Sequence, residues 1–221
     1  MFYIKSLIQD QKGNRVTEII LYELNPTRSA RCRWTLLEAG LKYESRGNTI
    51  EVFSSQELKQ THPLGKLPAA VINGKPLFES AAICTAIADL VPEQNLIAKS
   101  GTWARALHDQ WTLFVLTEIE PYLWSTELNT DKNGFLLPNE EQVPAIADQN
   151  RKFAQRAAVA LDAHLQNQEY LVENRFTVTD IITGYTVGWL EEVGLLESFP
   201  SLTAYLNRLS SRQHCTLTRH N

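Results

Sequence analysis

Hydrophobic and polar residues follow two different rhythms along the chain. Thr17–Leu24 is a run of strand length that ends at the turn-like Asn25-Pro26, and Ser29–Gly40 then places its apolar residues at helical spacing. Tyr43–Val52 fits a second strand, and Ser55–Thr61 fits a short helix. The order strand, helix, strand, helix predicts a mixed α/β unit at the N-terminal end.

A hairpin and a third helix complete this unit. Leu67–Ile72 is a brief β-like run, and Asn73-Gly74 is a strong hairpin signal that leads into Pro76–Phe78. Ser80–Leu90 is an apolar segment of helix length. We therefore expect residues 17–93 to fold as one α/β domain.

Beyond this unit the strand patterns end and long helical patterns take over. Apolar residues recur at three- and four-residue spacing over 104–115 and again over 146–165. The polar segment Asp131–Pro144 separates these two patterns. Pro121 predicts an end or a kink of the first helix.

The last part of the chain adds two more predicted helices. Thr177 and Asp180 form a capping box that opens one helix, and a final short helix is expected over 201–210. We expect four parts: an N-terminal arm over residues 1–16, the α/β domain over 17–93, a linker over 94–102 and an all-helical domain over 103–221.

Composition narrows the class of protein. The chain is 43% apolar and 21% charged, which is typical of a globular fold. Its formal net charge of −4 gives no electrostatic pull toward nucleic acid or anionic membranes. The longest uncharged apolar stretch, Ile181–Leu190, is about half of the roughly 20 residues that a membrane span needs. Three cysteines without CxxC spacing and five histidines without ligand spacing predict a cytoplasmic protein with no metal site.

Three signals for ligand binding fall close together. A cis peptide before Pro68 would turn the main chain of Leu67 outward to a peptide ligand, although an ordinary trans proline at a sheet edge has the same sequence. Ser80 at a helix start and Glu79 before it could hold the carboxylate and ammonium of an amino-acid head; alone, they read as an N-cap and a solvated carboxylate. Lys66 adds a second cation site or is a solvated lysine.

Four segments resemble the cytosolic-type glutathione S-transferase family, in the right order and over nearly the whole chain. They are SARCRWTLLEAGLKYE (Ser29–Glu44), THPLGKLPAAVINGKPLFES (Thr61–Ser80), LDAHLQNQEYLVENRFTVTDI (Leu161–Ile181) and FPSLTAYLNRLSSR (Phe199–Arg212). The resemblance implies a thioredoxin-like N-terminal domain followed by a helical-bundle C-terminal domain. It also implies a homodimer that uses glutathione as co-substrate.

The glutathione site carries over from the same resemblance. Leu67, before a cis Pro68, would bind the cysteinyl main chain of glutathione. Glu79 and Ser80 would take the γ-glutamyl amine and carboxylate, and Lys66 would also contact the tripeptide. These roles agree with the amino-acid head that the residues alone suggest.

The group that activates the glutathione thiol is less well marked in the sequence. A free thiol has a pKa of about 8.5, and a hydroxyl near the first helix start could stabilise the thiolate with help from the helix dipole. Pro26 stands at or near the position of the serine used by serine-type classes. We rank Ser29 first, Thr27 second and Tyr22 third, and a plain helix-capping role for Ser29 stays open.

The predicted activity is conjugation of the glutathione thiolate to a small apolar electrophile. Trp111 and Phe114 are expected either to line the electrophile pocket or to pack in the core. The alternatives are a non-catalytic binding module of the same fold and a glutathione-dependent thiol reductase or peroxidase. Cys32 lies one turn into the first helix, so we expect a buried, inert thiol there.

Overall fold

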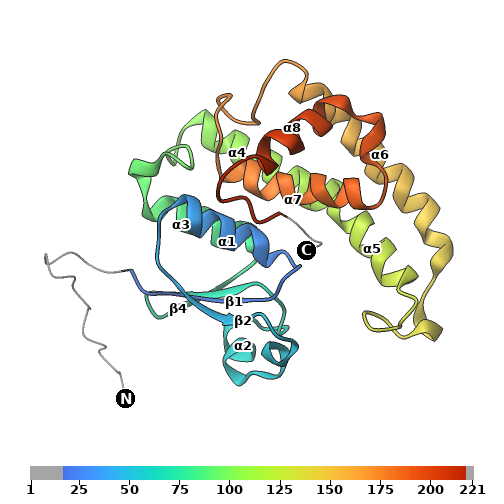
Figure 1. The fold of residues 1–221 in the computed structure, drawn as a ribbon, viewed down its shortest axis with the longest axis horizontal. Coiled ribbons are helices and arrows are strands. Elements are labelled where there is room, and N and C mark those ends of the chain that lie inside the picture. The colour runs from blue at the N-terminus through green and yellow to red at the C-terminus, as the bar shows by residue number, and fades with distance from the viewer. Residues whose placement is uncertain (1–16, 218–221) are drawn as a thin grey trace, which may run out of the picture.

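A four-stranded sheet forms the centre of the N-terminal half (Figure 1). In the computed structural model, which describes residues 17–217, the strand order is β2-β1-β3-β4. The strands are β1 (Ile19–Glu23), β2 (Glu44–Gly47), β3 (Ala69–Ile72) and β4 (Lys75–Phe78). β1 pairs parallel with β2 and antiparallel with β3, which pairs antiparallel with β4. The expected arm, residues 1–16, lies outside the described residues.

Three helices cover the two faces of this sheet. They are α1 (Ser29–Glu38), α2 (Gln56–Thr61) and α3 (Ser80–Leu90). α1 and α3 pack together on one face and α2 lies on the other (Figure 1). The N-cap Ser55 starts α2 by accepting a hydrogen bond from the Leu58 amide at 3.1 Å. The predicted thioredoxin-like arrangement of strands and helices is confirmed.

β2 is shorter than the sequence predicts. The strand ends at Gly47, whose φ is 137°, and Asn48 follows at φ 62°. A Cβ on Gly47 would lie 2.0 Å from the carbonyl oxygen of Glu23, so only glycine fits beside β1. The β-favouring residues after it form the short 3₁₀ helix η1 (Ile50–Ser54), and Val52 packs under α2 instead of extending the sheet.

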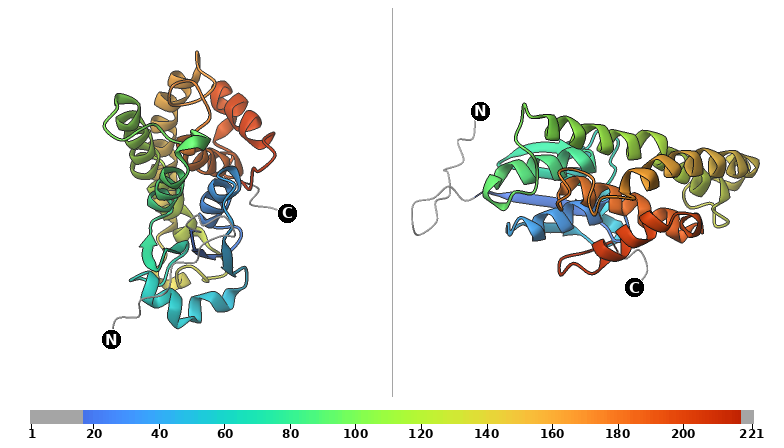
Figure 2. Two further views of the ribbon diagram at one scale, coloured as in Figure 1. Left: turned by 90° about the vertical axis from the view of Figure 1, so that its left-hand side faces the viewer. Right: turned by 90° about the horizontal axis from the view of Figure 1, so that it is seen from above.

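The C-terminal half is built from helices alone within the described residues. The longer ones are α4 (Trp103–Glu118), α5 (Glu120–Thr130), α6 (Ala147–Leu165), α7 (Val178–Glu192) and α8 (Pro200–Ser210). Pro121 lies in the first turn of α5, so the expected break after α4 is confirmed. α5 and α6 run side by side and extend beyond the sheet (Figures 1 and 2).

α7 is the central helix that joins the two halves. It packs against α1, α3, α4 and α8, and one continuous core includes Trp34 of α1, Ile83 of α3 and Ile181 of α7. The predicted capping box is present: the Thr177 amide donates to Asp180 at 2.8 Å, and Tyr205 donates to the same carboxylate at 2.9 Å. In residues 17–217 no helix has the length and apolar character needed to cross a bilayer.

Candidate functional site

A groove of about 350 Å³ lies where the end of the sheet meets α4 and α5. It is lined by Arg28, His62, Lys66, Leu67, Pro68, Glu79, Ser80, Leu116, Glu120, Pro121 and Trp124. All five residues that the sequence assigns to a glutathione site are among them. Their gathering depends on the antiparallel β3–β4 hairpin, because the start of β3 and the end of β4 share one end of the sheet.

The segment before β3 presents main chain to this groove. The Leu67–Pro68 peptide bond is cis, as the sequence predicts. Pro68 is buried, Leu67 is half-buried and Lys66 is exposed. β3 pairs with β4 only from Ala69 onward, so the Leu67 main chain lies outside the ladder. It is therefore available to an extended ligand backbone.

The N-terminal end of α3 forms the second wall. Glu79 is the N-cap, with φ 70°, and no side chain caps the helix. Ser80 begins the helix and is buried, whereas Glu79 is exposed. The first amides of an uncapped helix attract an anion, and the exposed carboxylate beside them attracts a cation. This end of α3 can thus hold both charges of an amino-acid head.

A buried ionic cluster underlies the groove. Glu120 at the start of α5 accepts a hydrogen bond from Arg28 Nε at 2.8 Å, and it also pairs with Arg31. The Thr186 hydroxyl donates to the same carboxylate at 2.8 Å. Burial alone would raise the pKa of Glu120, but Arg31 and Arg28 together hold that pKa below its ordinary value. Glu120 offsets one of the two guanidinium charges, and the Glu127 carboxylate of α5 also attracts Arg28.

Arg28 is the arginine of this cluster that borders the groove. It is the N-cap of α1, so it stands at the positive end of the helix dipole. Its side chain is 31% exposed, and its guanidinium lies 5.5 Å from the Trp124 ring centroid and 5.3 Å from that of Trp189. Sequence reasoning missed Arg28, Arg31 and Glu120. The spacing of the two arginines on α1 was visible, but their carboxylate partner comes from a distant segment.

The hydroxyl groups of Ser29 and Thr27, the two predicted near α1, form hydrogen bonds within the turn that precedes this helix. Ser29 is fully buried, and its Oγ accepts from the Leu24 amide at 3.3 Å. Thr27 donates its only hydroxyl hydrogen to the Leu24 carbonyl at 2.6 Å. In the 2.7 Å contact between the two hydroxyls, Ser29 must therefore be the donor. Neither residue lines the groove.

Tyr22, the third predicted hydroxyl, faces another part of the molecule. It is buried under α2 with Val52 and Leu58, and its hydroxyl accepts a hydrogen bond from Arg46 at 3.3 Å. Tyr22, Arg46 and Val52 border a separate hollow of about 480 Å³ that also includes Thr49. Among the described residues, Ser80 is the only hydroxyl that borders the groove.

The apolar wall of the groove comes from residues other than those predicted. Trp111 packs with its ring centroid 4.4 Å from that of His164 and 5.5 Å from that of Phe114. Both side chains join the hydrophobic core and do not border the groove. Leu116 and Trp124 border the groove where Trp111 and Phe114 were expected. Core packing, the alternative role that the sequence left open, therefore describes Trp111 and Phe114.

The thiol of Cys32 is buried, as expected. It faces Cys84 of α3 at an S–S distance of 4.0 Å, and neither thiol has any exposed surface. Burial, above all, raises the pKa of Cys32. Within residues 17–217, no three His, Cys, Asp or Glu side chains gather where they could hold a metal ion.

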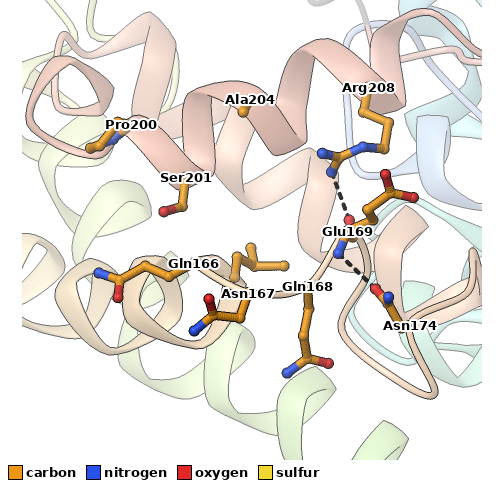
Figure 3. A pocket seen from close by; sticks show the side chains of 10 residues that line it. Gln166, Asn167, Gln168, Glu169, Asn174, Pro200, Ser201, Ala204 and Arg208 are labelled. Atoms are coloured by element: carbon orange, nitrogen blue, oxygen red, sulfur yellow. Dashed lines mark hydrogen bonds between the residues drawn. The ribbon is translucent and has the colours of Figure 1, made fainter.

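A second hollow, of about 460 Å³, lies between the end of α6 and α8 (Figure 3). Arg208 donates to the carbonyl oxygen of Glu169 at 2.7 Å, and the Asn174 side chain accepts from the Glu169 amide at 2.6 Å. The other labelled polar side chains include the amides of Gln166 and Gln168 (Figure 3). This hollow is a surface depression braced by its own hydrogen bonds, remote in sequence from every predicted site residue.

Comparisons with known proteins agree with this geometry. The family model "Glutathione S-transferase, N-terminal domain" matches residues 17–89, and "Glutathione S-transferase, C-terminal domain" matches 111–213. Glutathione S-transferase U22 of Arabidopsis thaliana is 28% identical over 92% of this chain and 90% of its own. Protein LigF of Sphingobium is 24% identical over 87% of this chain and 89% of its own.

A solved structure shows the same architecture. The glutathione transferase of Methylococcus capsulatus superposes with a TM-score of 0.78 at 26% identity, covering 89% of this chain and 95% of its own. The two family models and this shared fold lead to one conclusion. The chain belongs to the glutathione S-transferase family.

Proposed function

We propose that this protein conjugates the thiolate of glutathione to a small apolar electrophile. The observation that carries the proposal is the groove itself, because it joins a peptide-binding edge and an amino-acid-head site to an apolar wall from the helical half. Leu67 and Pro68 would hold the cysteinyl main chain. Glu79 and Ser80 would hold the γ-glutamyl amine and carboxylate, with Lys66 at the exposed rim.

The electrophile would sit against Leu116, Pro121 and Trp124. These side chains come from α4 and α5 and face the α/β half across the groove. An aromatic ring and two aliphatic surfaces favour an apolar co-substrate. The thiolate sulfur would form a bond to the electrophilic carbon, and the leaving group would depart with its electron pair.

Arg28 is proposed to stabilise the thiolate, in place of the hydroxyl groups that the sequence favours. The hydroxyl groups of Ser29 and Thr27 form hydrogen bonds with the turn before α1. Arg28, in contrast, borders the groove at the positive end of that helix. Arg28 shares Glu120 with Arg31, so this one carboxylate offsets only part of the charge of the two guanidinium groups. A cation and a helix dipole both lower the pKa of a nearby thiol.

Two further properties belong to the same proposal. Family membership supports the proposal of a homodimer that works in the cytoplasm, and several relatives are named as transferases. LigF, by contrast, is named as a β-etherase in its solved structure. A glutathione-dependent bond cleavage of that kind would use the same thiolate and the same groove.

The test is an assay with glutathione and an activated aryl chloride, with the thioether product followed by mass spectrometry. The proposal predicts a rate well above that of the uncatalysed mixture and its near loss in the Glu79→Ala/Ser80→Ala variant. Ser201→Ala, in the remote hollow between α6 and α8, is the matched control and should keep the wild-type rate. Glutathione binding without any conjugation of several electrophile classes would instead identify a binding module.

A further inference from the structure

Arg31 is one of the largest fully buried side chains, yet it carries a charge. Its guanidinium donates to the Ile182 carbonyl and to the Thr186 hydroxyl, each at 3.0 Å, and it pairs with Glu120. It also lies 4.7 Å from the centroid of the Tyr185 ring. The helical half therefore fixes the position of this group on several sides.

The NH1 group of Arg31 contacts the α/β half of the molecule, unlike the donors described above. It donates to Ser80 Oγ at 3.3 Å. A guanidinium has donors only, so the Ser80 oxygen must act as the acceptor in this contact. The hydroxyl hydrogen of Ser80 then has to find another acceptor. The part of the chain that the structure describes offers it none within hydrogen-bond distance, and Ser80 borders the groove.

We propose that Arg31 is a positioning residue for glutathione that acts through Ser80. Arg31 donates a hydrogen bond to the Ser80 oxygen from the buried side, and this leaves the hydroxyl hydrogen to face the groove. The acceptor there would be the γ-glutamyl α-carboxylate, at the open N-terminus of α3. This inference rests on the proposed function, because it assumes that glutathione is the ligand.

The arrangement also links ligand binding to the helical half. Ser80 belongs to α3, whereas the other partners of Arg31 belong to α5 and α7. A carboxylate held by Ser80 would also feel the positive charge of Arg31 through a buried, weakly screened path. Loss of Arg31 should therefore weaken recognition of that one carboxylate more than recognition of the rest of the tripeptide.

The experiment compares glutathione with γ-aminobutyryl-cysteinyl-glycine, which lacks only the α-carboxylate of the γ-glutamyl unit. Wild-type protein should bind glutathione about 10-fold or more tightly than this analogue, the usual range for a hydrogen bond to a charged group. Ser80→Ala and Arg31→Lys should each reduce that preference several-fold, because the free amides at the start of α3 still attract the carboxylate. Thr186→Val removes a different partner of Arg31 and should keep the preference. Arg31→Lys should add no further loss on a Ser80→Ala background.

The outcomes separate the inference from the proposed function. Wild-type protein that binds neither compound contradicts the proposed function itself. Wild-type protein that prefers glutathione while Arg31→Lys weakens both compounds equally, or keeps the full preference, overturns the role of Arg31. If Arg31→Lys does not fold, nitrogen NMR of the wild-type Arg31 side chain decides. Glutathione, but not the analogue, should shift the NH1 resonance; equal shifts, or none, overturn the inference.

Discussion

The guanidinium Nε of Arg28 lies 2.8 Å from a carboxylate oxygen of Glu120, and this pair joins the two halves of the molecule beside the groove. Arg28 is the N-cap of α1, and Glu120 is the first residue of α5. The same carboxylate forms an ion pair with the fully buried Arg31. One acidic residue therefore holds two arginines in place, one facing the groove and one beneath it.

The first prediction concerns the stability of this cluster. Glu120→Gln leaves two guanidinium groups without their negative partner, one of them fully buried. We expect the free energy of unfolding to fall by about 3–5 kcal/mol, because breaking a buried ion pair strands a charge. Urea unfolding followed by circular dichroism measures this change.

Asp89→Asn is the matched control. Asp89 pairs with Arg105 through a side chain that is 48% exposed, so its loss should change the free energy of unfolding by less than about 1 kcal/mol. Equal losses in the two variants would mean that the cluster beneath the groove contributes no more than an ordinary surface pair.

The second prediction concerns pH. Burial lowers the pKa of His108 to about 4 from an ordinary 6.5, while its ring bonds to Thr85 and Thr179. As the pH falls from 6.5 to 4, the unfolded chain binds a proton there and the folded chain does not. This histidine should therefore cost about 3 kcal/mol of stability by pH 4, at roughly 1.4 kcal/mol per pKa unit.

The measurement is the difference between wild type and His108→Gln in urea unfolding at pH 7, 5.5 and 4. The difference is needed because Asp180, with a pKa raised to about 6, gains stability over part of the same interval. The wild type should lose stability relative to His108→Gln as the pH falls. A constant difference at the three pH values would show that the folded chain protonates His108 as readily as the unfolded chain.

The third prediction separates two tryptophans. Trp124 borders the groove, and Trp111 packs against His164. Trp124→Leu should raise KM for an apolar electrophile by about 10-fold and leave KM for glutathione unchanged, because one aromatic contact with the electrophile is lost. Trp111→Leu should leave both constants unchanged and lower the free energy of unfolding by about 1–3 kcal/mol. The reverse assignment of effects would put the electrophile on the other face of α4.

The fourth prediction concerns the thiol. Arg28→Met should raise the pKa of bound glutathione toward about 8.5, the value of a free thiol, and slow conjugation near neutral pH. Ser29→Ala is the control, since its hydroxyl is buried in the turn before α1. We expect it to lower stability by about 1 kcal/mol without moving the kinetic pKa. A pKa shift confined to Ser29→Ala would return the activating role to that hydroxyl.

Much of the groove could be predicted from the sequence because its signals are local. Leu67 and Pro68 stand next to each other, as do Glu79 and Ser80, and one hairpin brings the two pairs together. The helix start at Ser80 also agrees with the structure, because its apolar pattern is unambiguous. Such features depend on a few neighbouring residues and one turn.

Other features depend on contacts between distant segments. Arg31 meets Glu120 and Thr186 only after α5 and α7 have packed against α1. Trp111 and Trp124 are the same residue type on consecutive helices, and only the rotation of each helix decides which one borders the groove. A one-dimensional pattern does not contain that rotation.

The most direct test of the account is calorimetric titration of glutathione into wild-type protein and into the Glu79→Ala/Ser80→Ala variant. We predict saturable binding to the wild type and a loss in the variant on the order of 2–4 kcal/mol, because two contacts to charged groups disappear. Circular dichroism must show that the variant keeps its fold. No binding to the wild type, or equal binding to a folded variant, would contradict the claim that this groove is a glutathione site.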